Sequence, residues 1–135
     1  MMFLGIDLGT TNVKALAVDA RGTIAAQGSA PVNRTTTPGG GVEQDIDQIW
    51  EATCQAIREA AGQVSSEDIR AIGISSQGGA LQLLGAVGEP LGPVISWLDS
   101  RGRRFDRDFE QRMGEEYLVA HTGHNVSSMT VGQLL

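Results

Sequence analysis

The chain has 135 residues, a length typical of one domain, and 41% of them are hydrophobic, which is enough for a buried core. Its formal net charge of −6 at pH 7 excludes the basic surface typical of nucleic-acid binding and offers no attraction to an anionic membrane. The single cysteine, Cys54, excludes an internal disulfide framework and fits a reducing compartment, and no apolar run reaches the roughly 18 residues of a membrane span. The composition predicts a soluble, cytoplasmic protein with neither nucleic acid nor a membrane as partner.

The first part of the chain predicts three strands joined by short turns. Residues 2–8 are apolar except for Asp7 and indicate a buried strand. Residues 13–19 alternate before the turn signal of residues 19–22, and residues 23–32 indicate a weaker third strand. Such short connections favour an antiparallel meander.

Residues 34–41, Arg-Thr-Thr-Thr-Pro-Gly-Gly-Gly, predict a loop by composition. The apolar residues of the segment 45–61 then recur at the spacing of one helical face, with Asp45 as N-cap, Gln48 as its capping-box partner and Gly62 as the stop. A strand over residues 70–77 follows. Strands joined by a helix usually pair in parallel with a right-handed crossover, so this strand is expected beside an earlier one.

The rest of the chain predicts a hairpin around Val87-Gly88-Glu89, a charged helical stretch over residues 99–116 and a loop over residues 121–125. His121 and His124 in that loop have no third candidate ligand, which favours loop packing or solvent exposure over a metal site. The last six residues, Thr-Val-Gly-Gln-Leu-Leu, read as the opening of a helix without a stop signal. We therefore expect the chain to be the front portion of a longer protein.

Asp7 is the first candidate functional residue, because a charge within an apolar strand is costly without a partner. The plain structural alternative is turn chemistry, in which the Asp caps, the Gly adopts a positive φ and the Thr bonds locally. Three catalytic patterns do not match. An aspartic protease has Thr or Ser where Leu8 stands, a haloacid-dehalogenase-type phosphatase has a second Asp where Gly9 stands, and Lys14 lacks the setting of a Walker lysine.

Residues 5–19, Gly-Ile-Asp-Leu-Gly-Thr-Thr-Asn-Val-Lys-Ala-Leu-Ala-Val-Asp, resemble the first phosphate motif of the actin, Hsp70 and sugar-kinase superfamily, in which a hairpin turn wraps the phosphates of ATP. Glycine allows close approach to an anion, turn N–H groups and threonine hydroxyls suit phosphate oxygens, a carboxylate anchors Mg²⁺ through water, and a lysine offsets the charge of the transferred phosphoryl group. The resemblance implies ATP and Mg²⁺ as cofactors, Asp7 as the metal-binding residue, and a nucleotide site made of Asp7, Gly9, Thr10, Thr11, Asn12 and Lys14.

Four further motifs, in residues 41–50, 71–84, 91–101 and 121–123, narrow the resemblance to the FGGY carbohydrate kinases, which include xylulokinase, glycerol kinase, gluconokinase and ribulokinase. This resemblance implies ATP-dependent phosphorylation of a hydroxyl of a sugar or sugar alcohol. It also implies a substrate site drawn from Gln77, Gly78, Gly79, Trp97, Asp99 and Arg101, in which an aromatic face packs on the sugar and polar groups bond its hydroxyls.

Each of these substrate-site residues has a plainer alternative. Trp97 could fill a core, Asp99 with Arg101 could be a helix start plus a surface ion pair, and Gly78-Gly79 could be an ordinary loop. The two glycines stand where glycerol kinase has Arg-Glu and xylulokinase has Met-His, and Met129 stands where glycerol kinase presents an aromatic. The sequence therefore supports assignment neither to glycerol kinase nor to xylulokinase. Two glycines leave room for a bulkier substrate or for a side chain supplied from elsewhere.

The expected fold is α/β and ribonuclease-H-like, as in actin-like ATPases: an antiparallel three-strand meander, a crossover helix, a parallel strand and an inserted hairpin. Residues 1–135 are expected to be the N-terminal part of the first kinase domain, an incomplete domain lacking the second. The resemblance places the general-base Asp downstream, so no catalytic residue is expected in this chain and the chain alone is expected to be inactive. The alternative is a non-catalytic remnant that binds a partner or forms a homo-oligomer through exposed apolar surface.

Overall fold

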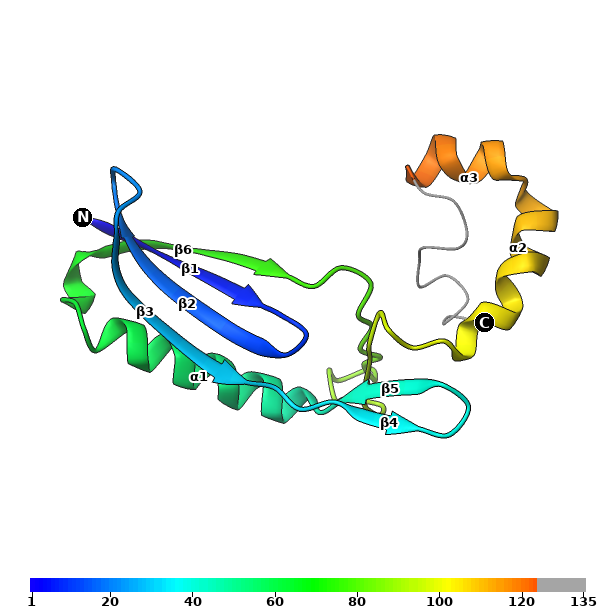
Figure 1. The fold of residues 1–135 in the computed structure, drawn as a ribbon, viewed down its shortest axis with the longest axis horizontal. Coiled ribbons are helices and arrows are strands. Elements are labelled where there is room, and N and C mark those ends of the chain that lie inside the picture. Colours follow the sequence, from blue (N-terminus) through cyan, green and yellow to red (C-terminus); the bar gives the residue numbers. More distant parts are fainter. Residues whose placement is uncertain (124–135) are drawn as a thin grey trace. The chain divides into compact units, whose positions relative to one another are not determined.

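The computed structural model describes residues 1–123, which form two compact units. The first unit comprises residues 1–34 and 44–77, and the second comprises residues 35–43 and the described residues from 78 onward. Figure 1 shows the helices and strands in chain order. No helix in residues 1–123 has the length and apolar character needed to cross a membrane.

The first unit is built on a four-stranded sheet with the strand order β3-β2-β1-β6. β1 (Met2–Leu8), β2 (Asn12–Asp19) and β3 (Ile24–Pro31) form an antiparallel meander. β6 (Ile69–Ser76) follows a short 3₁₀ turn, Ser66–Asp68, and pairs with β1 in parallel. The predicted meander and the predicted parallel strand are both confirmed.

The crossover between β3 and β6 is α1 (Ile46–Ala61), which lies along one face of the sheet (Figure 1). Asp45 is its N-cap, as predicted, and its carboxylate accepts a hydrogen bond from the Asp47 N–H at 2.8 Å. Gly62 ends the helix, also as predicted. The side-chain oxygen of Gln48 accepts from the Asn33 amide at 3.5 Å, and no capping-box bond from Gln48 is found in the described part of the chain.

Small side chains let α1 lie close to the sheet. Within residues 1–123 this core contains eleven buried residues, seven of which are alanines: Ala15, Ala17, Ala26, Ala30, Ala52, Ala56 and Ala60. Gly28 of β3 marks the closest approach, because a Cβ there would lie 2.2 Å from the carbonyl oxygen of Ala56. Trp50, one of the apolar residues of the segment 45–61 that were expected on the core face, is instead 66% exposed, and the buried residues of α1 are Ala52, Thr53, Ala56 and Ala60.

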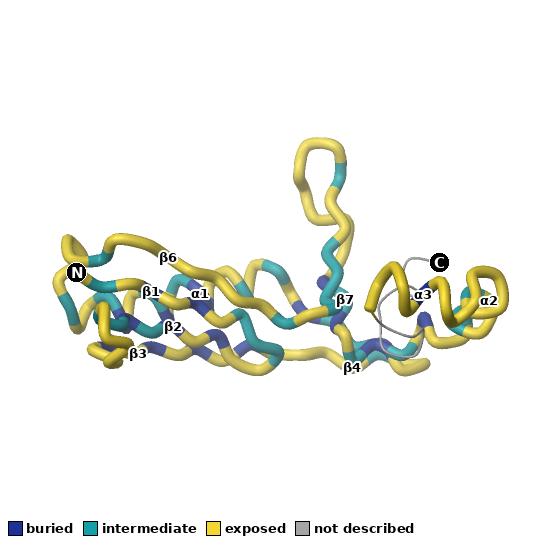
Figure 2. Tube along the Cα trace, turned by 90° about the horizontal axis from the view of Figure 1, so that it is seen from above, coloured by how far each residue is buried: buried dark blue, intermediate teal, exposed yellow. Residues whose placement is uncertain are grey.

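β1 is a strand as predicted, but it is buried on one face only. Leu4 and Ile6 point toward α1, whereas Phe3, Gly5 and Asp7 lie on the opposite face and are exposed. The physical reason is that no element of this unit covers that second face. β6 is exposed along most of its length (Figure 2), and its Ile72 and Ile74 are 60% and 70% exposed.

The second unit contains a small sheet of β4 (Thr35–Thr37), β5 (Gly41–Gln44) and β7 (Val94–Ile95), in that order. The prediction of a loop over residues 34–41 is therefore wrong. The three threonines pair as a strand with β5, and Gly39 and Gly40 form the tight turn with φ values of +81° and +88°. Glycine is suited to such left-handed backbone, so the glycine run marks a hairpin turn.

The predicted hairpin around Val87-Gly88-Glu89 is confirmed by two antiparallel bridges, Leu81 with Ile95 and Leu84 with Pro90. The predicted charged helical stretch is also confirmed, although it is divided into a 3₁₀ helix (Arg101–Phe105), α2 (Asp106–Met113) and α3 (Glu115–Thr122).

The predicted loop over residues 121–125 begins too early, because His121 lies in the last turn of α3. Its ring stacks on Tyr117 with a centroid separation of 4.0 Å, and its Nδ1 lies 2.8 Å from the Tyr117 carbonyl oxygen. Among the described residues this histidine belongs to no metal-binding group. His124, Met129 and the expected terminal helix lie outside the described residues.

Candidate functional site

The turn that joins β1 to β2, residues 9–12, carries the first set of candidate residues. The Gly9 N–H donates to the Asn12 carbonyl at 3.1 Å across the turn. A Cβ on Gly9 would lie 2.6 Å from that same oxygen. Glycine is therefore required here for close approach within the turn, and the positive φ of the plain structural alternative is absent.

Asp7 and Lys14 stand on either side of this turn as direct cross-strand partners of β1 and β2. Both are exposed on the sheet face opposite α1, and both line an open depression of about 450 Å³. The other lining residues come from β1, β2 and β6: Gly5, Ile6, Leu16, Gly73, Ile74 and Ser75. The structure thus brings the candidate carboxylate and the candidate ammonium to one concave surface.

The chemistry at Asp7 suits a magnesium ion that is shared with phosphates. Within residues 1–123 no group of three or more His, Cys, Asp and Glu side chains is placed to hold a metal. Mg²⁺ commonly binds one or two carboxylates and completes its shell with water and substrate phosphates. A single exposed carboxylate beside a glycine-containing turn fits that requirement.

Thr10 takes part in a closed ring of three hydrogen bonds within the first unit. Its hydroxyl donates to Gln77 Oε1 at 2.8 Å, Gln77 Nε2 donates to Gln44 Oε1 at 3.0 Å, and Gln44 Nε2 donates to the Thr10 carbonyl at 3.1 Å. The ring ties the turn to the residue that follows β6 and to the last residue of β5. Gln77, predicted in the substrate site, has its side chain here. Sequence reasoning missed Gln44, which is 3% exposed, because no local pattern marks it as a partner of the turn.

Gly78 and Gly79 open the second unit, immediately after Gln77. A Cβ at Gly78 would meet no atom within 4 Å. Gly79 has a φ of +76°, a left-handed backbone conformation that favours glycine. The space beside Gly78 is therefore free in the described structure.

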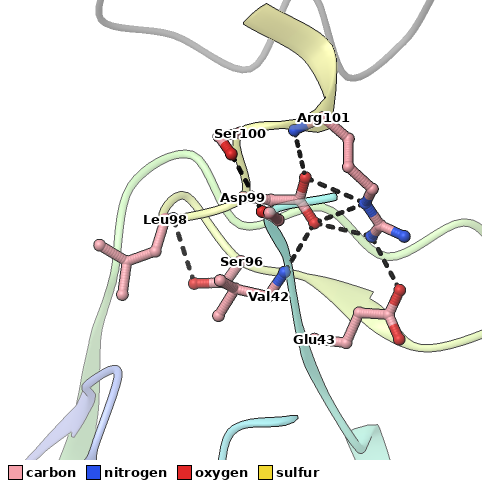
Figure 3. Close-up of polar contacts among 8 residues, drawn as sticks. Val42, Glu43, Ser96, Leu98, Asp99, Ser100 and Arg101 are labelled. Atoms are coloured by element: carbon pink, nitrogen blue, oxygen red, sulfur yellow. Dashed lines mark hydrogen bonds and ion pairs between the residues drawn. The ribbon is translucent and has the colours of Figure 1, made fainter. Parts of the chain in front are cut away.

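Asp99 is the polar centre of the second unit (Figure 3). Its Oδ2 accepts from the Val42 N–H at 2.9 Å, and its Oδ1 accepts from the Arg101 N–H at 2.9 Å. The Arg101 guanidinium also donates to this carboxylate, with Nη2 2.6 Å from Asp99 Oδ2. The same Nη2 lies 2.7 Å from Glu43 Oε1. The Asp99 side chain is only 1% exposed, so this cluster is a buried clamp between β5 and the segment after β7.

The charges of this clamp stabilise each other. Burial disfavours the ionised form of Asp99, but the hydrogen bonds from the Arg101 side chain and from Val42 and Arg101 outweigh it, and the pKa of Asp99 lies below its ordinary value. Hydrogen bonds to Asp99 and then to Glu43 raise the pKa of Arg101 above its ordinary value. Both groups are therefore charged throughout the physiological range.

Trp97 lies two residues before Asp99 and is 51% exposed, which removes core filling as its role. Its neighbour Ser96 is buried, and the Ser96 N–H donates to the Val42 carbonyl at 2.9 Å. A pocket of about 290 Å³ in this unit is lined by Glu43, Asp99 and Arg101 but not by Trp97. The structure thus places three of the substrate-site candidates on one fixed segment without gathering all of them in one cavity.

Comparisons with known proteins give a consistent family assignment. Residues 2–135 match the N-terminal domain of the FGGY family of carbohydrate kinases. The chain is 32% identical to an apulose kinase of Pectobacterium atrosepticum over 95% of its own length, and 36% identical to a xylulose kinase of Streptomyces rubiginosus over 90%. A crystal structure described as a "xyloylose kinase" from Brucella ovis superposes with a TM-score of 0.90 at 30% identity over 99% of the chain and 28% of that structure. The chain spans only about a quarter of the length of the two relatives, 26% and 25%.

Proposed function

Because the chain belongs to the FGGY family of carbohydrate kinases, we propose that it is the phosphate-binding part of an ATP-dependent kinase that acts on a sugar or a sugar alcohol. The observation that supports this proposal most strongly is the pairing of Asp7 and Lys14 across one open depression beside the turn of residues 9–12. A metal anchor and a countercharge on one concave surface are what phosphoryl transfer requires.

In this proposal the turn receives the polyphosphate of ATP. Gly9 allows the close approach of the phosphates, the backbone amides of Thr10, Thr11 and Asn12 and the side chains of Thr11 and Asn12 bond phosphate oxygens, and Lys14 offsets their charge. Asp7 holds Mg²⁺, which neutralises the phosphates when it is bound. These roles are consistent with the exposure of Asp7, Thr11, Asn12 and Lys14.

The acceptor is proposed to be a small sugar or polyol, handled by the second unit. Trp97 is half exposed, and Gly78 leaves open space for the substrate or for another side chain. Since Asp99 and Arg101 bind each other, their proposed part is to hold the segment that carries Trp97. The two relatives are named for two different sugars, apulose and xylulose, so the proposal stays at the class of sugar or polyol.

We propose further that residues 1–135 are the N-terminal part of the first kinase domain and do not transfer phosphate alone. The described residues offer a surface for phosphates and metal, and the general base for the sugar hydroxyl is proposed to lie downstream. Catalysis of this kind depends on holding nucleotide, metal and acceptor together. In keeping with its net charge and single cysteine, the parent enzyme is proposed to be cytoplasmic.

The nucleotide role is tested by NMR titration of the ¹⁵N-labelled chain with millimolar MgATP. We expect shifts at Gly9, Thr10 and Thr11, and a clear loss of affinity in Asp7→Asn but not in the control Asp108→Asn, whose carboxylate is exposed on α2. Equal affinity in the wild type and Asp7→Asn would contradict the proposed metal anchor. Sustained ADP release in the presence of D-xylulose or glycerol would contradict the proposed inactivity of the isolated chain.

A second candidate function, self-association, is favoured by the outer edge of β6. Two backbone groups on the outer edge of β3 are bonded to side chains of α1 and of the residue after its C-cap. The Ser29 N–H donates to Glu59, and the Gln63 amide donates to the Gln27 carbonyl. Within the described residues the outer edge of β6 has no such cover, and Ile72 and Ile74 flank it. Sedimentation velocity would detect the oligomer, and Ile74→Lys is expected to dissociate it into monomers.

A further inference from the structure

The ring of Thr10, Gln77 and Gln44 has one permitted direction of donation. A backbone carbonyl can only accept, so the amide nitrogen of Gln44 must face the Thr10 carbonyl, 3.1 Å away. The Gln44 oxygen then faces Gln77, which must present its own nitrogen at 3.0 Å. The remaining Gln77 oxygen accepts the Thr10 hydroxyl proton at 2.8 Å. Each of the three bonds pairs one donor with one acceptor, and none of the ring's members is charged.

This ring fixes the direction of one peptide group in the turn. The described chain has no cis peptide bond, so the Thr11 N–H points opposite to the Thr10 carbonyl of the same peptide plane. Because Gln44 holds that carbonyl from the interior, the Thr11 N–H is directed away from Gln44. Thr11 is exposed while Gln44 is 3% exposed, so the amide points toward the outside of the turn.

Other carbonyls of the turn are held in the same way. The Val32 N–H donates to the Thr11 carbonyl at 2.9 Å, and the Gln77 N–H donates to the Leu8 carbonyl at 3.0 Å. The negative ends of these peptide dipoles are thus bound to protein donors, and Gln77 contributes through both its backbone and its side chain. A turn fixed in this way, with its Thr11 N–H facing outward, is suited to an anion.

We propose that Gln44 and Gln77 are positioning residues that hold the Thr10–Thr11 peptide so that the Thr11 N–H is presented to a phosphate oxygen of the bound nucleotide. This inference rests on the proposed function, because it assigns the ring a ligand at the same turn. An amide is suited to the task because it donates and accepts at once without adding negative charge near a polyphosphate. A carboxylate at position 44 would keep the bond from Gln77 but lose the bond to Thr10.

The test replaces the amide of Gln44 with a carboxylate and then restores the lost hydrogen-bond donor by protonating that carboxylate. In Gln44→Glu at pH 7 the carboxylate cannot donate, so the amide shift of Thr11 is expected to move away from its wild-type value. Protonated Glu has the donor and acceptor of an amide, so acidification is expected to bring the Thr11 shift back. The midpoint should lie above the ordinary Glu pKa of about 4.3, since only the neutral acid completes the buried ring.

Gln55→Glu is the matched control, because Gln55 is exposed on α1 and the chemical change is the same. It is expected to leave the Thr11 shift unchanged from pH 4.5 to pH 7.5. Gln77→Glu provides a second variant, in which the donor to Gln44 is lost instead. A Thr11 amide that keeps its wild-type shift at pH 7 in both Gln44→Glu and Gln77→Glu would overturn the inference.

MgATP titration of the same samples separates this inference from the proposed function. We expect Gln44→Glu to bind about fivefold more weakly than the wild type at pH 7, the worth of one hydrogen bond, and to match the wild type once its acid is protonated. If the wild type shows no shift at the turn with millimolar MgATP, both the proposed function and this inference fail. If the wild type binds and Gln44→Glu binds equally at pH 7, only this inference fails.

Discussion

The two units fix their polar segments by opposite chemistry, although the residues responsible are adjacent in the sequence. Gln44 joins the neutral ring that holds the turn of residues 9–12, whereas Glu43 joins the charged clamp around Asp99 and Arg101. Hydrogen bonds between amides and hydroxyls are independent of pH near neutrality. The charged clamp adds the attraction of opposite charges, but its contribution depends on protonation. The difference fits the proposed ligands, since a neutral ring adds no further negative charge beside the polyphosphate, whereas a neutral sugar is not repelled by a charged clamp.

The comparison can be measured because each unit contains one of the two tryptophans, Trp50 in the first and Trp97 in the second. Trp97→Phe therefore gives a fluorescence signal of the first unit, and Trp50→Phe gives one of the second. Stability differences measured by urea unfolding in these two backgrounds can be assigned to one unit each.

The largest effect is expected for Gly28→Ala, which tests the seat of α1 on the sheet. The added Cβ would lie 2.2 Å from the Ala56 carbonyl oxygen and 2.9 Å from the Ala60 nitrogen, so the helix must move. We expect the first unit to lose about 3 kcal/mol in unfolding free energy, at the upper end of typical overpacking costs.

Gly73→Ala is the control for that variant, because a Cβ on this strand residue would meet no atom within 4 Å. It is expected to change the stability of the first unit by less than about 0.5 kcal/mol, as most open-surface substitutions do. Equal losses in Gly28→Ala and Gly73→Ala would show that α1 does not lie where the structure places it.

The next largest effect is expected for Asp99→Asn, which breaks the charged clamp and leaves the neutral ring intact. The amide nitrogen of the substituted side chain would then face the Val42 N–H or the Arg101 guanidinium, and two donors cannot bond each other. We expect the second unit to lose about 2 kcal/mol, since a buried donor is left unpaired beside an uncompensated charge. Asp108→Asn should be neutral, and an unchanged urea midpoint for Asp99→Asn would contradict the clamp.

A smaller effect is expected for Arg101→Lys, which keeps the charge and removes the fork. One guanidinium here contacts Asp99 through Nε and Nη2 and Glu43 through Nη2, and a single ammonium cannot reproduce this arrangement. We expect a loss of about 1 kcal/mol in the second unit, because Arg101 is 41% exposed and water replaces part of the lost contact. If Arg101→Lys were as stable as the wild type, a positive charge at this position would be sufficient for the stability of the second unit, and the forked geometry would not be needed.

The smallest and most selective effect is expected from pH. The pKa of Asp99 is lower in the folded chain, because the hydrogen bonds of Arg101 and Val42 outweigh its burial. Its contribution is therefore complete above the unfolded value of about 3.9 and is lost as pH falls through the folded value. The stability gap between wild type and Asp99→Asn should shrink below about pH 4, and a gap that stays constant to pH 3 would contradict this sign.

The sequence was sufficient for the main elements because their signals are local. The period-2 pattern and turn residues gave the meander, and Asp45 and Gly62 marked the ends of α1. Two errors came from tertiary context. The apolar residues 2–8 predicted a buried strand, but only one face of it meets α1. The glycines after Thr37 predicted a loop, but their positive φ values make the turn of a hairpin.

The candidate site was predictable only where one motif carried it. The spacing of Asp7, Gly9 and Lys14 around a turn was enough to place them at one surface. The ring of Thr10, Gln44 and Gln77 was not, because its members are 33 to 67 residues apart and each pair meets only through the fold. Asp99 and Arg101 were correctly singled out as a pair, but no local pattern reveals that the carboxylate also binds Val42, 57 positions earlier.

The alanine layer between α1 and the sheet has a consequence for how the first unit responds to stress. Alanine has no side-chain rotamer to exchange, so the alanine part of this interface cannot adjust by changing rotamers. A wider or narrower spacing between the helix and the strands therefore requires the helix backbone itself to move.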